Sequence, residues 1–384
     1  MENKVSQRVK NIEISGIRKF YNKVAKVDGA ISLTIGQPDF FVPYKIKEAM
    51  IKAINENKTG YTSNAGILEL RQEISDNLKK DNIHFDADEI CITVGGSEGI
   101  MSVFSAILNP MDKVLIPTPA YPAYENCVRI AGGEVVNYEL ISSDFSIHIE
   151  NLKRLIKDCK PKAIVLSFPC NPTGAVLSKA SRDELYNILK DEDIIIITDE
   201  MYSALTYSDG YYSMAQYKDL KEKIILINGF SKIFSMTGLR IGYVCASKNF
   251  MNQIMKVHQY SVSCAPSIVQ YGALEGLKSC TQDVEKMRLE FKKRRDFLYE
   301  GLTKLGFEVS LPQGAFYMFP SIGKYNMDSD AFCEKLLQNA KVAVVPGSAF
   351  GKGGEGYFRV SYASSIRDLD EALRRIKREV IKWW

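Results

Sequence analysis

The chain has 384 residues, of which 46% are hydrophobic, and its 50 basic and 46 acidic residues give a formal net charge of +4. This length fits two or three domains, or one large and one small domain, with enough apolar residues for a sizeable core. The near balance of charges argues against a nucleic-acid-binding protein. The basic run at residues 292–295 lies in a helical pattern and is interpreted as a solvated helix face.

Cysteines and histidines are few and scattered along the chain. The eight cysteines lack any C-x-x-C spacing, and His84, His148 and His258 lie outside nucleophile or metal-ligand patterns. We therefore expect no disulfide framework, no metal site and a reducing, cytoplasmic location. The charged N-terminal stretch is unlike a signal peptide and the apolar runs are too short to span a bilayer, so no membrane association is expected.

Strand-like and helix-like segments alternate through the first two thirds of the chain. Apolar runs predict strands at residues 90–94, 113–116, 163–167, 193–198, 224–228 and 241–246. Helical patterns fall between them at residues 97–108, 120–131 and 181–190. This alternation predicts a parallel or mostly parallel sheet that is covered by helices.

The C-terminal third changes character. Residues 268–305 are predicted to be largely helical, followed by short strands at 315–319, 342–345 and 357–361 and a last amphipathic helix at 366–380. We interpret this part as a smaller α+β domain to which the N-terminal residues add an arm. The predicted division is 1–44 for the arm and part of the small domain, 45–285 for the large domain and 286–384 for the small domain.

The most informative segment is FSKIFSMTGLRIGY, residues 230–243, which follows the apolar run at residues 223–228. It places Lys232 after Ser231, near the end of a buried strand, and Arg240 eight residues further on. A desolvated amine can form a Schiff base, and a guanidinium can hold a phosphate. A single Lys-Ser pair is usually an ordinary surface lysine, so the prediction depends on the whole segment.

A glycine-rich turn offers a second phosphate ligand. The segment TVGGSEGIM, residues 93–101, puts Gly95, Gly96 and Ser97 between a predicted strand and a predicted helix. Free backbone N–H groups and the positive end of the helix favour an anion there. Such turns are common, so the prediction gains its weight from Arg240, which adds a fixed charge for one phosphate monoester.

Two further turns carry a ring and an amide. Tyr121 lies in PTPAYPAY and Asn171 in SFPCNPTG, each after a predicted strand. The ring of Tyr121 is suited to stack on a flat cofactor, and the alternative is an ordinary core or surface tyrosine. The amide of Asn171 is suited to donate to a phenolic oxygen, and the alternative is an ordinary turn residue. Loops at the carboxyl ends of strands in an open α/β sheet converge, so we expect both residues near Lys232.

Charged residues next to apolar runs complete the candidate site. Asp199 ends the run DIIIITDEMY, where a carboxylate is costly unless it meets a cation or a donor, such as a protonated pyridine nitrogen. Tyr202 is placed to donate to the phenolate, whereas Glu200 is expected to point elsewhere because adjacent strand residues alternate faces. Arg359 in YFRVSYA suits an α-carboxylate, with a surface salt bridge as the alternative.

Together these segments resemble the fold-type-I pyridoxal-phosphate aminotransferases of class I/II, in their aspartate/aromatic-type subgroup. The resemblance runs from ISLTIGQPDF (31–40) and YTSNAGILELR (61–71) to QGAFYMFP (313–320), VVPGSAFG (344–351) and FRVSYA. It implies the α/β fold of these transferases, a large domain with a mostly parallel seven-stranded sheet plus a small α+β domain. The string IEISGIRKF (12–20) is similar to bacterial enzymes assigned to N-acetyl-LL-diaminopimelate transamination.

The resemblance implies a role for each candidate residue around pyridoxal 5′-phosphate. Lys232 resembles the lysine that binds the cofactor and shuttles a proton, and Asp199 resembles the partner of the pyridine nitrogen. The other implied cofactor ligands are Asn171 and Tyr202 at O3′, Tyr121 as the stacking ring, and Gly95, Gly96, Ser97, Ser231 and Arg240 around the phosphate. Tyr61 and Ser263 are implied to reach the site of a neighbouring subunit in a homodimer. The implied substrate ligands are Arg359, Asn171 and the backbone of Gly36.

Two positions depart from the family pattern. Gly229 stands where many relatives carry a phosphate-binding serine, which leaves open whether Ser231 takes over that role. Leu239 stands where many relatives have a tryptophan, outside the chemical roles.

The implied reaction is ping-pong transfer of an amino group between an L-amino acid and a 2-oxo acid. N-acetyl-LL-diaminopimelate, aspartate and aromatic amino acids are the candidate donors. Arg18 is a candidate for a distal carboxylate and equally for a surface residue. A pyridoxal-phosphate C–S β-lyase is the alternative activity, and a regulatory protein that reuses the fold is disfavoured by the intact lysine, aspartate and arginine set.

Overall fold

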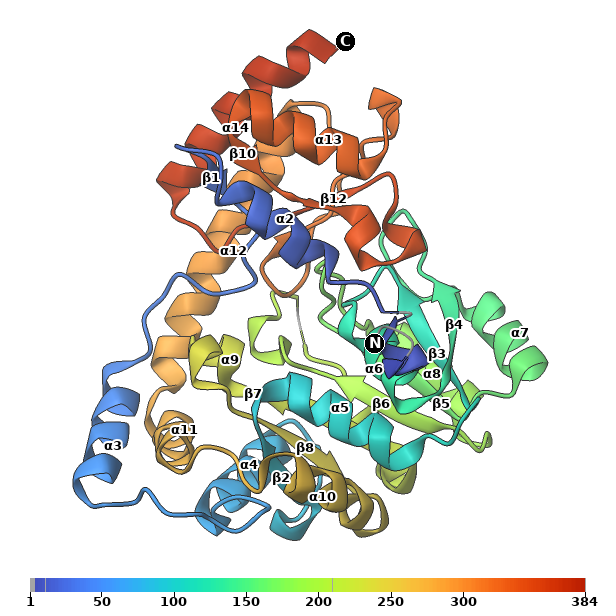
Figure 1. Ribbon diagram of the computed structural model, residues 1–384, viewed down its shortest axis with the longest axis vertical. Coiled ribbons are helices and arrows are strands. Elements are labelled where there is room, and N and C mark those ends of the chain that lie inside the picture. Colours follow the sequence, from blue (N-terminus) through green and yellow to red (C-terminus); the bar gives the residue numbers. More distant parts are fainter. Residues whose placement is uncertain (1–3, 11, 209, 384) are drawn as a thin grey trace.

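A seven-stranded sheet forms the centre of the computed structural model, which describes residues 4–10, 12–208 and 210–383 (Figure 1). The strand order is β2-β8-β7-β6-β5-β3-β4, in which β8 runs antiparallel to both neighbours and all other pairs are parallel. The strands are β2 (Ile90–Thr93), β3 (Lys113–Thr118), β4 (Glu134–Glu139), β5 (Ala163–Ser167), β6 (Ile195–Asp199), β7 (Ile224–Gly229) and β8 (Gly242–Ala246). The predicted mostly parallel sheet is confirmed.

The apolar runs of the strands are explained by burial on both faces of this sheet. In β7, Ile225 and Ile227 pack on one face and Ile224 and Leu226 on the other, because successive strand residues point to opposite sides. The first face is covered by α5 (Gly95–Ile107), α6 (Ala123–Ala131) and α10 (Lys248–Val262). The second face is covered by α4 (Leu68–Lys80), α7 (Ile149–Cys159), α8 (Lys179–Leu189) and α11 (Ser267–Ser279).

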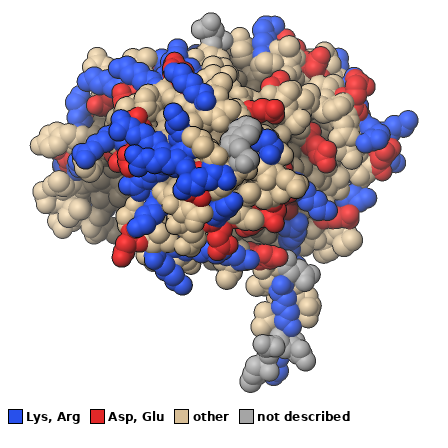
Figure 2. All heavy atoms as spheres, turned by 90° about the horizontal axis from the view of Figure 1, so that it is seen from above, with Lys and Arg blue, Asp and Glu red and all other residues tan. Residues whose placement is uncertain are grey.

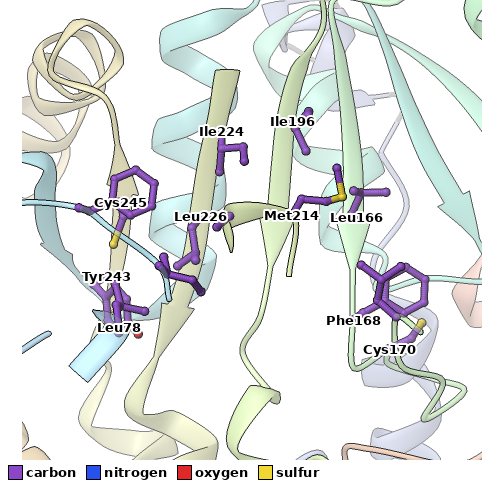
Figure 3. Packing of buried hydrophobic residues seen from close by; sticks show 14 of the residues in the cluster. Leu78, Leu166, Phe168, Cys170, Ile196, Met214, Ile224, Leu226, Tyr243 and Cys245 are labelled. Carbon is purple, nitrogen blue, oxygen red and sulfur yellow. The ribbon is translucent and has the colours of Figure 1, made fainter. Parts of the chain in front are cut away.

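A close view of the second face shows how one layer of the core is built. In Figure 3, Met214 lies beside Leu166 of β5 and Ile196 of β6, and all three are almost completely buried. Burying one aliphatic side chain of this size stabilises a fold by roughly 1.5–3 kcal/mol. These side chains pack the segment of Met214 against the paired strands β5 and β6.

Several elements of the structure differ from the prediction. Strand β4 was not predicted, because it lies at the sheet edge and its sequence, EVVNYE, has exposed glutamates at both ends. Helix α7 was not predicted either. The predicted helical stretch 268–305 is two helices, α11 and α12 (Thr281–Lys304), which are separated at Cys280, a fully buried residue with a non-helical backbone.

The C-terminal part contains two small sheets. One is antiparallel, with the order β11 (Val345–Pro346), β12 (Phe358–Ser361) and β9 (Tyr317–Met318). In the other, β1 (Ile31–Ser32) runs parallel to β10 (Val342–Ala343) and so ties the N-terminal arm to this part of the chain. The predicted strand 342–345 is therefore two strands with different partners.

A separate hydrophobic cluster lies beneath these small sheets. It joins α2 (Gly16–Val24) to α12 and to the last helix, α14 (Ile366–Val380), whose bounds match the prediction. The remaining α-helices of the described residues are α1 (Gln7–Lys10), α3 (Tyr44–Asn55), α9 (Phe230–Ile233) and α13 (Ser329–Lys335). The first residues of the predicted arm, 1–3, and residue 11 lie outside the described residues.

The basic run at residues 292–295 is only partly a solvated helix face, so this interpretation was wrong for two of its residues. Arg294 and Arg295 are 8% and 5% exposed. The Arg294 guanidinium contacts Asp39 at 2.7 Å, and the Arg295 guanidinium donates to the carbonyl of Pro312 at 3.0 Å. Acceptors from distant segments satisfy both groups, which a helical pattern by itself does not reveal.

The surface near the C-terminal helix carries both signs of charge. Figure 2 shows Lys and Arg gathered over one part of this face, with Asp and Glu among them. The ion pairs between residues about one helical turn apart at this end of the chain are Arg374–Asp370, Arg375–Glu371 and Lys382–Glu379. None of the helices in the described residues has both the length and the apolar character needed to cross a bilayer.

Candidate active site

A pocket of about 330 Å³ lies where β5, β6 and β7 end. The sequence-predicted residues that line it are Gly36, Gly96, Ser97, Tyr121, Asn171, Asp199, Tyr202, Ser231, Lys232, Arg240 and Arg359. The parallel strands deliver several of these side chains to one edge of the sheet, as expected for an open α/β fold. Segments more than 300 residues apart in sequence, such as those of Gly36 and Arg359, thus share one cavity.

Lys232 lies on the short helix α9, directly after β7. Its Nζ donates a hydrogen bond to the backbone carbonyl of Gly36 at 2.5 Å. Burial, aided by the cations Arg359 and Arg240 and opposed by Asp199, lowers the pKa of Lys232 to about 8. Roughly a tenth of the amine is therefore uncharged at pH 7 and about half at pH 8, and the uncharged amine can act as a nucleophile or a base.

Asp199 is a buried carboxylate that forms no salt bridge within the described residues, although the charge of Lys232 acts on it from a longer distance. Its Oδ2 accepts from the Tyr124 hydroxyl at 2.7 Å and its Oδ1 from the backbone N–H of Met201 at 3.0 Å. Burial raises the pKa of Asp199, against the lowering effect of these hydrogen bonds. None of the described residues forms an ion pair with it, so the carboxylate is suited to a cationic ligand.

Glu200 points away from the pocket, as predicted. Its Oε1 accepts from the hydroxyls of Thr198 at 2.7 Å and Ser213 at 2.5 Å. Burial raises the pKa of Glu200 to about 7. Of the two adjacent carboxyl groups, only Asp199 therefore faces the cavity.

Arg359 is a buried cation that lacks an acidic partner among the described residues. Arg359 is 2% exposed. Its guanidinium donates hydrogen bonds to the Asn171 side-chain oxygen at 2.8 Å and to the Thr34 carbonyl at 2.6 Å. Its Nε has no hydrogen-bond partner among the described residues. Its guanidinium lies 4.4 Å from the ring centre of Tyr317 and 4.9 Å from that of Phe350. The alternative of a surface salt bridge is wrong, and the site is suited to an anionic ligand.

The start of α5 and the Arg240 guanidinium meet at another part of the cavity. A side chain at Gly95 would place its Cβ 2.5 Å from the Arg240 Nη2, and the φ of Gly95 is +74°. Glycine therefore permits both the backbone conformation and the close approach. Backbone N–H groups at the helix start, the Ser231 hydroxyl and the guanidinium form a donor set for a phosphate.

The departure at Gly229 has a steric explanation. A Cβ at this position would lie 2.8 Å from the Cα of Gly242, so the paired ends of β7 and β8 leave little room for a serine there. Ser231, in contrast, lines the pocket.

Six lining residues were not singled out from the sequence, namely Ile17, Ile100, Tyr124, Ser167, Met201 and Tyr317. Two of them are tyrosines that contact predicted site residues. Tyr124 follows Tyr121 by three residues and holds Asp199, and Tyr317 of β9 places its hydroxyl 2.9 Å from that of Tyr202. The repeat of tyrosine in PTPAYPAY is a weak signal for Tyr124. No spacing in QGAFYMFP marks Tyr317, because buried aromatic residues surround it on both sides.

Some predicted residues lie outside this pocket. Tyr61 is 90% exposed and lines a different surface depression, and Ser263 follows α10 with a φ of +64°. Arg18 is exposed, whereas its neighbour Ile17 lines the pocket. Within one chain, therefore, neither Tyr61 nor Arg18 is part of the cavity.

Comparisons with known proteins identify the class of this fold and site. A family model described as aminotransferase class I and II matches residues 28–376. The chain belongs to this family, and it is a pyridoxal-phosphate-dependent aminotransferase of fold type I.

The residues of the pocket fit this cofactor. The buried carboxylate of Asp199 suits its ring nitrogen, and the amine of Lys232, with its lowered pKa, suits its aldehyde. The donors around Gly95 and Arg240 suit its phosphate.

Individual relatives cover nearly the whole chain. A Bacillus subtilis protein named probable N-acetyl-LL-diaminopimelate aminotransferase is 46% identical and covers 100% of this chain and 97% of its own length. Aromatic-amino-acid aminotransferase 2 of Thermococcus litoralis is 38% identical over 97% of both chains. The structure of aspartate aminotransferase from Thermus thermophilus with maleate superposes with a TM-score of 0.93, at 35% identity over 97% of this chain and 99% of that chain.

The lowered pKa of Lys232 predicts the pH dependence of cofactor attachment. We expect apoenzyme to attach pyridoxal 5′-phosphate faster as the pH rises, because only the uncharged amine attacks. The rate should be half-maximal at a midpoint of about pH 8 and should level off above it. Arg359→Met removes a neighbouring cation and should move this midpoint to higher pH. The growth of the cofactor absorbance band after rapid mixing measures the rate. A midpoint near the ordinary lysine value of about 10.4 would contradict the assignment.

Proposed function

We propose that the pocket is the catalytic site and that two unpaired buried charges define its ends. The observation that carries this proposal is that Asp199 and Arg359 are both buried and form no ion pair within the described residues. Asp199 holds the proton on the pyridine nitrogen, and Arg359, with Asn171 and the backbone of Gly36, holds the substrate α-carboxylate. Each buried charge thereby gains a partner when its ligand is bound.

Lys232 is the proposed proton carrier of the reaction. Its uncharged amine takes the proton from the substrate Cα and later returns it, and such positioned transfer contributes about 10²–10⁴-fold to the rate. When bound, pyridoxal 5′-phosphate draws off the electron pair that proton removal leaves on Cα. Tyr202 donates to the phenolic oxygen, as does the Asn171 amide, and Tyr121 stacks on the ring.

The phosphate is held by the start of α5 and by the segment after β7. Its proposed ligands are the backbone and side chains of Gly95, Gly96, Ser97, Ser231 and Arg240. Ser231 supplies the hydroxyl for which Gly229 has no room. The helix start adds a partial positive charge toward the anion.

N-acetyl-LL-diaminopimelate is the proposed first candidate donor, ahead of aspartate and aromatic amino acids. The Bacillus subtilis relative named for that substrate is 46% identical over the whole chain. The string at residues 12–20 supports the choice, because its Ile17 forms part of the pocket wall. Among the described lining residues, the cations are Lys232, Arg240 and Arg359, which leaves none within one chain for the second carboxylate that both N-acetyl-LL-diaminopimelate and aspartate carry.

An anaerobic half-reaction tests both the reaction class and the donor. Purified holoenzyme is mixed with N-acetyl-LL-diaminopimelate, aspartate, glutamate, phenylalanine or tyrosine, and the cofactor band is followed from its aldehyde to its amine form. Conversion by one donor with release of the matching 2-oxo acid is the expected result. Pyruvate and ammonia released from cystathionine, without any band conversion by the donors, would establish the C–S β-lyase instead.

Asp199→Asn provides a sharp test of the pyridine-nitrogen assignment. We expect the variant to bind the cofactor, because Lys232 and the phosphate ligands remain, but to lose roughly 10²-fold or more in the half-reaction rate. Glu200→Gln is the matched control, because it alters an adjacent buried carboxyl group outside the pocket and should react at nearly the wild-type rate. Equal rates for Asp199→Asn and wild type would contradict the assignment.

A homodimer with shared active sites is the proposed assembly, and a second copy of this chain is the proposed occupant of an apolar groove near α3. Met50, Ile51 and Ile54 line this groove together with Leu239, which directly precedes Arg240. The large apolar side chains exposed in the same stretch of chain are Phe41, Tyr44, Ile51, Ile54, Tyr61 and Leu68. Their exposure is unusual for a monomer and is relieved in a dimer. Tyr61 of each subunit then reaches the phosphate of the other.

Hybrid dimers test whether Tyr61 acts across the interface. Tyr61→Phe should weaken pyridoxal 5′-phosphate binding by roughly 10–100-fold, the loss of one hydrogen bond to a charged group. When Tyr61→Phe subunits are mixed with Lys232→Ala subunits, one site per hybrid should combine an intact Lys232 with an intact Tyr61 and bind the cofactor tightly. If mixing restores no tight site, Tyr61 does not act on the partner.

Two further assignments stay proposals. We propose a cytoplasmic, reducing location, which is supported by the eight free cysteines. The domain division at residues 44 and 285 is supported by the hydrophobic cluster under the small sheets, most of whose residues lie before 45 or after 285. Tyr202, Leu205 and Tyr207 join this cluster from the large domain, and Phe319, Val345 and Phe350 join a cluster of the large sheet, so the two parts also pack on each other.

A further inference from the structure

His258 of α10 is fully buried, and both of its ring nitrogens face oxygen atoms. Its Nδ1 lies 3.2 Å from each carboxylate oxygen of Glu98, and its Nε2 lies 3.0 Å from the backbone carbonyl of Asn64. A carbonyl and a carboxylate both accept hydrogen bonds, so each ring nitrogen must supply a proton. The contacts thus describe an imidazolium between two acceptors.

Glu98 is the acidic partner and lies in the first turn of α5. Its carboxylate also accepts from the backbone N–H of Val94 at 3.0 Å and from the Ser102 hydroxyl at 2.5 Å. Burial raises the pKa of Glu98, but the hydrogen bonds from His258, Ser102 and the Val94 N–H, together with the interaction with a charged His258, lower it by more, so the net shift is downward. The carboxyl group therefore remains ionised and needs a positive counter-charge.

The other titratable groups near this pair do not supply that charge. Cys91 of β2 stays a neutral thiol, because burial and then the charge of Glu98 raise its pKa. Arg71 of α4 donates to the backbone carbonyls of Gly66 and Ala87 instead. Within the described residues, His258 is the one basic side chain that contacts Glu98.

The position of Glu98 creates an electrostatic conflict with the proposed phosphate site. The start of α5 is the proposed phosphate-binding end, and Glu98 follows Ser97 directly. A free carboxylate in that turn would repel a phosphate dianion and cancel part of the favourable field of the helix end. A neutral ion pair removes this repulsion while the carboxylate still caps the Val94 N–H.

We propose that His258 is a positioning residue that neutralises Glu98 as a buried imidazolium and thereby preserves the phosphate affinity of α5. The inference rests on the proposed phosphate site. The same ring holds the loop that begins at Tyr61, because the Asn64 side chain in turn donates to the carbonyl of Ser263 at 2.6 Å. One buried side chain thus links the phosphate end of the site to the segment proposed to cross the dimer interface.

A double-mutant cycle on the full-length apoenzyme tests this role. The ratio of the Kd for pyridoxal to the Kd for pyridoxal 5′-phosphate, measured by equilibrium dialysis, isolates the contribution of the phosphate. His258→Gln should lower the ratio roughly tenfold, because Glu98 is left without its counter-charge. Glu98→Gln and the double variant Glu98→Gln/His258→Gln should keep the wild-type ratio. An equal loss in His258→Gln and the double variant would overturn the proposal, because it would indicate a merely structural role.

Two controls keep the outcome interpretable. Nitrogen-15 NMR of histidine-labelled wild-type holoenzyme should show both ring nitrogens of His258 protonated at pH 8. In Glu98→Gln, only one of the two ring nitrogens should remain protonated. A neutral His258 ring in the wild-type enzyme would overturn the proposal. Arg240→Met tests the phosphate site itself. If Arg240→Met keeps the wild-type ratio, the proposed phosphate site is wrong; if only Arg240→Met lowers it, the role of His258 is wrong.

Discussion

Burial of two opposite charges without ionic partners is the constraint on which this site depends. Moving an ion out of water costs several kcal/mol even in a real protein interior. The chain offsets part of this cost with neutral groups, the Tyr124 hydroxyl and Met201 N–H at Asp199, and the Asn171 and Thr34 oxygens at Arg359. Because these groups orient the charges without neutralising them, the pocket is preorganised for a ligand with complementary ends.

The architecture explains how one cavity collects such groups. Parallel strands end at the same edge of the sheet. Asn171 follows β5, Asp199 ends β6 and Tyr202 follows it, and Lys232 follows β7. The small sheets contribute Arg359 and Tyr317 from β12 and β9, and the arm contributes Gly36. The groups proposed for proton transfer, carboxylate binding and phosphate binding therefore lie on different parts of the fold, and packing between these parts sets their distances.

Sequence reasoning succeeded where a polar residue follows an apolar strand. Lys232 and Asp199 were predictable because buried strands end beside them, and so was the outward orientation of Glu200, which follows from strand alternation. Tyr317 and His258 were not, because a buried tyrosine or histidine looks the same in sequence whatever its hydroxyl or ring nitrogens contact. Arg294 was misinterpreted for a related reason, since its partner Asp39 is 255 residues away.

By itself, the sequence determined the fold class, the family resemblance and the order of the motifs, because these depend on local patterns of apolar residues, glycines and charges. The tertiary structure alone decided which charges are left without partners and which carboxylate faces the pocket. It also showed that Ser231 lines the cavity. The backbone of Gly242, in contrast, leaves no room for a side chain at Gly229. The physical reason is that burial and pairing arise between distant segments, as in the contact of Arg359 with Thr34 across 325 residues.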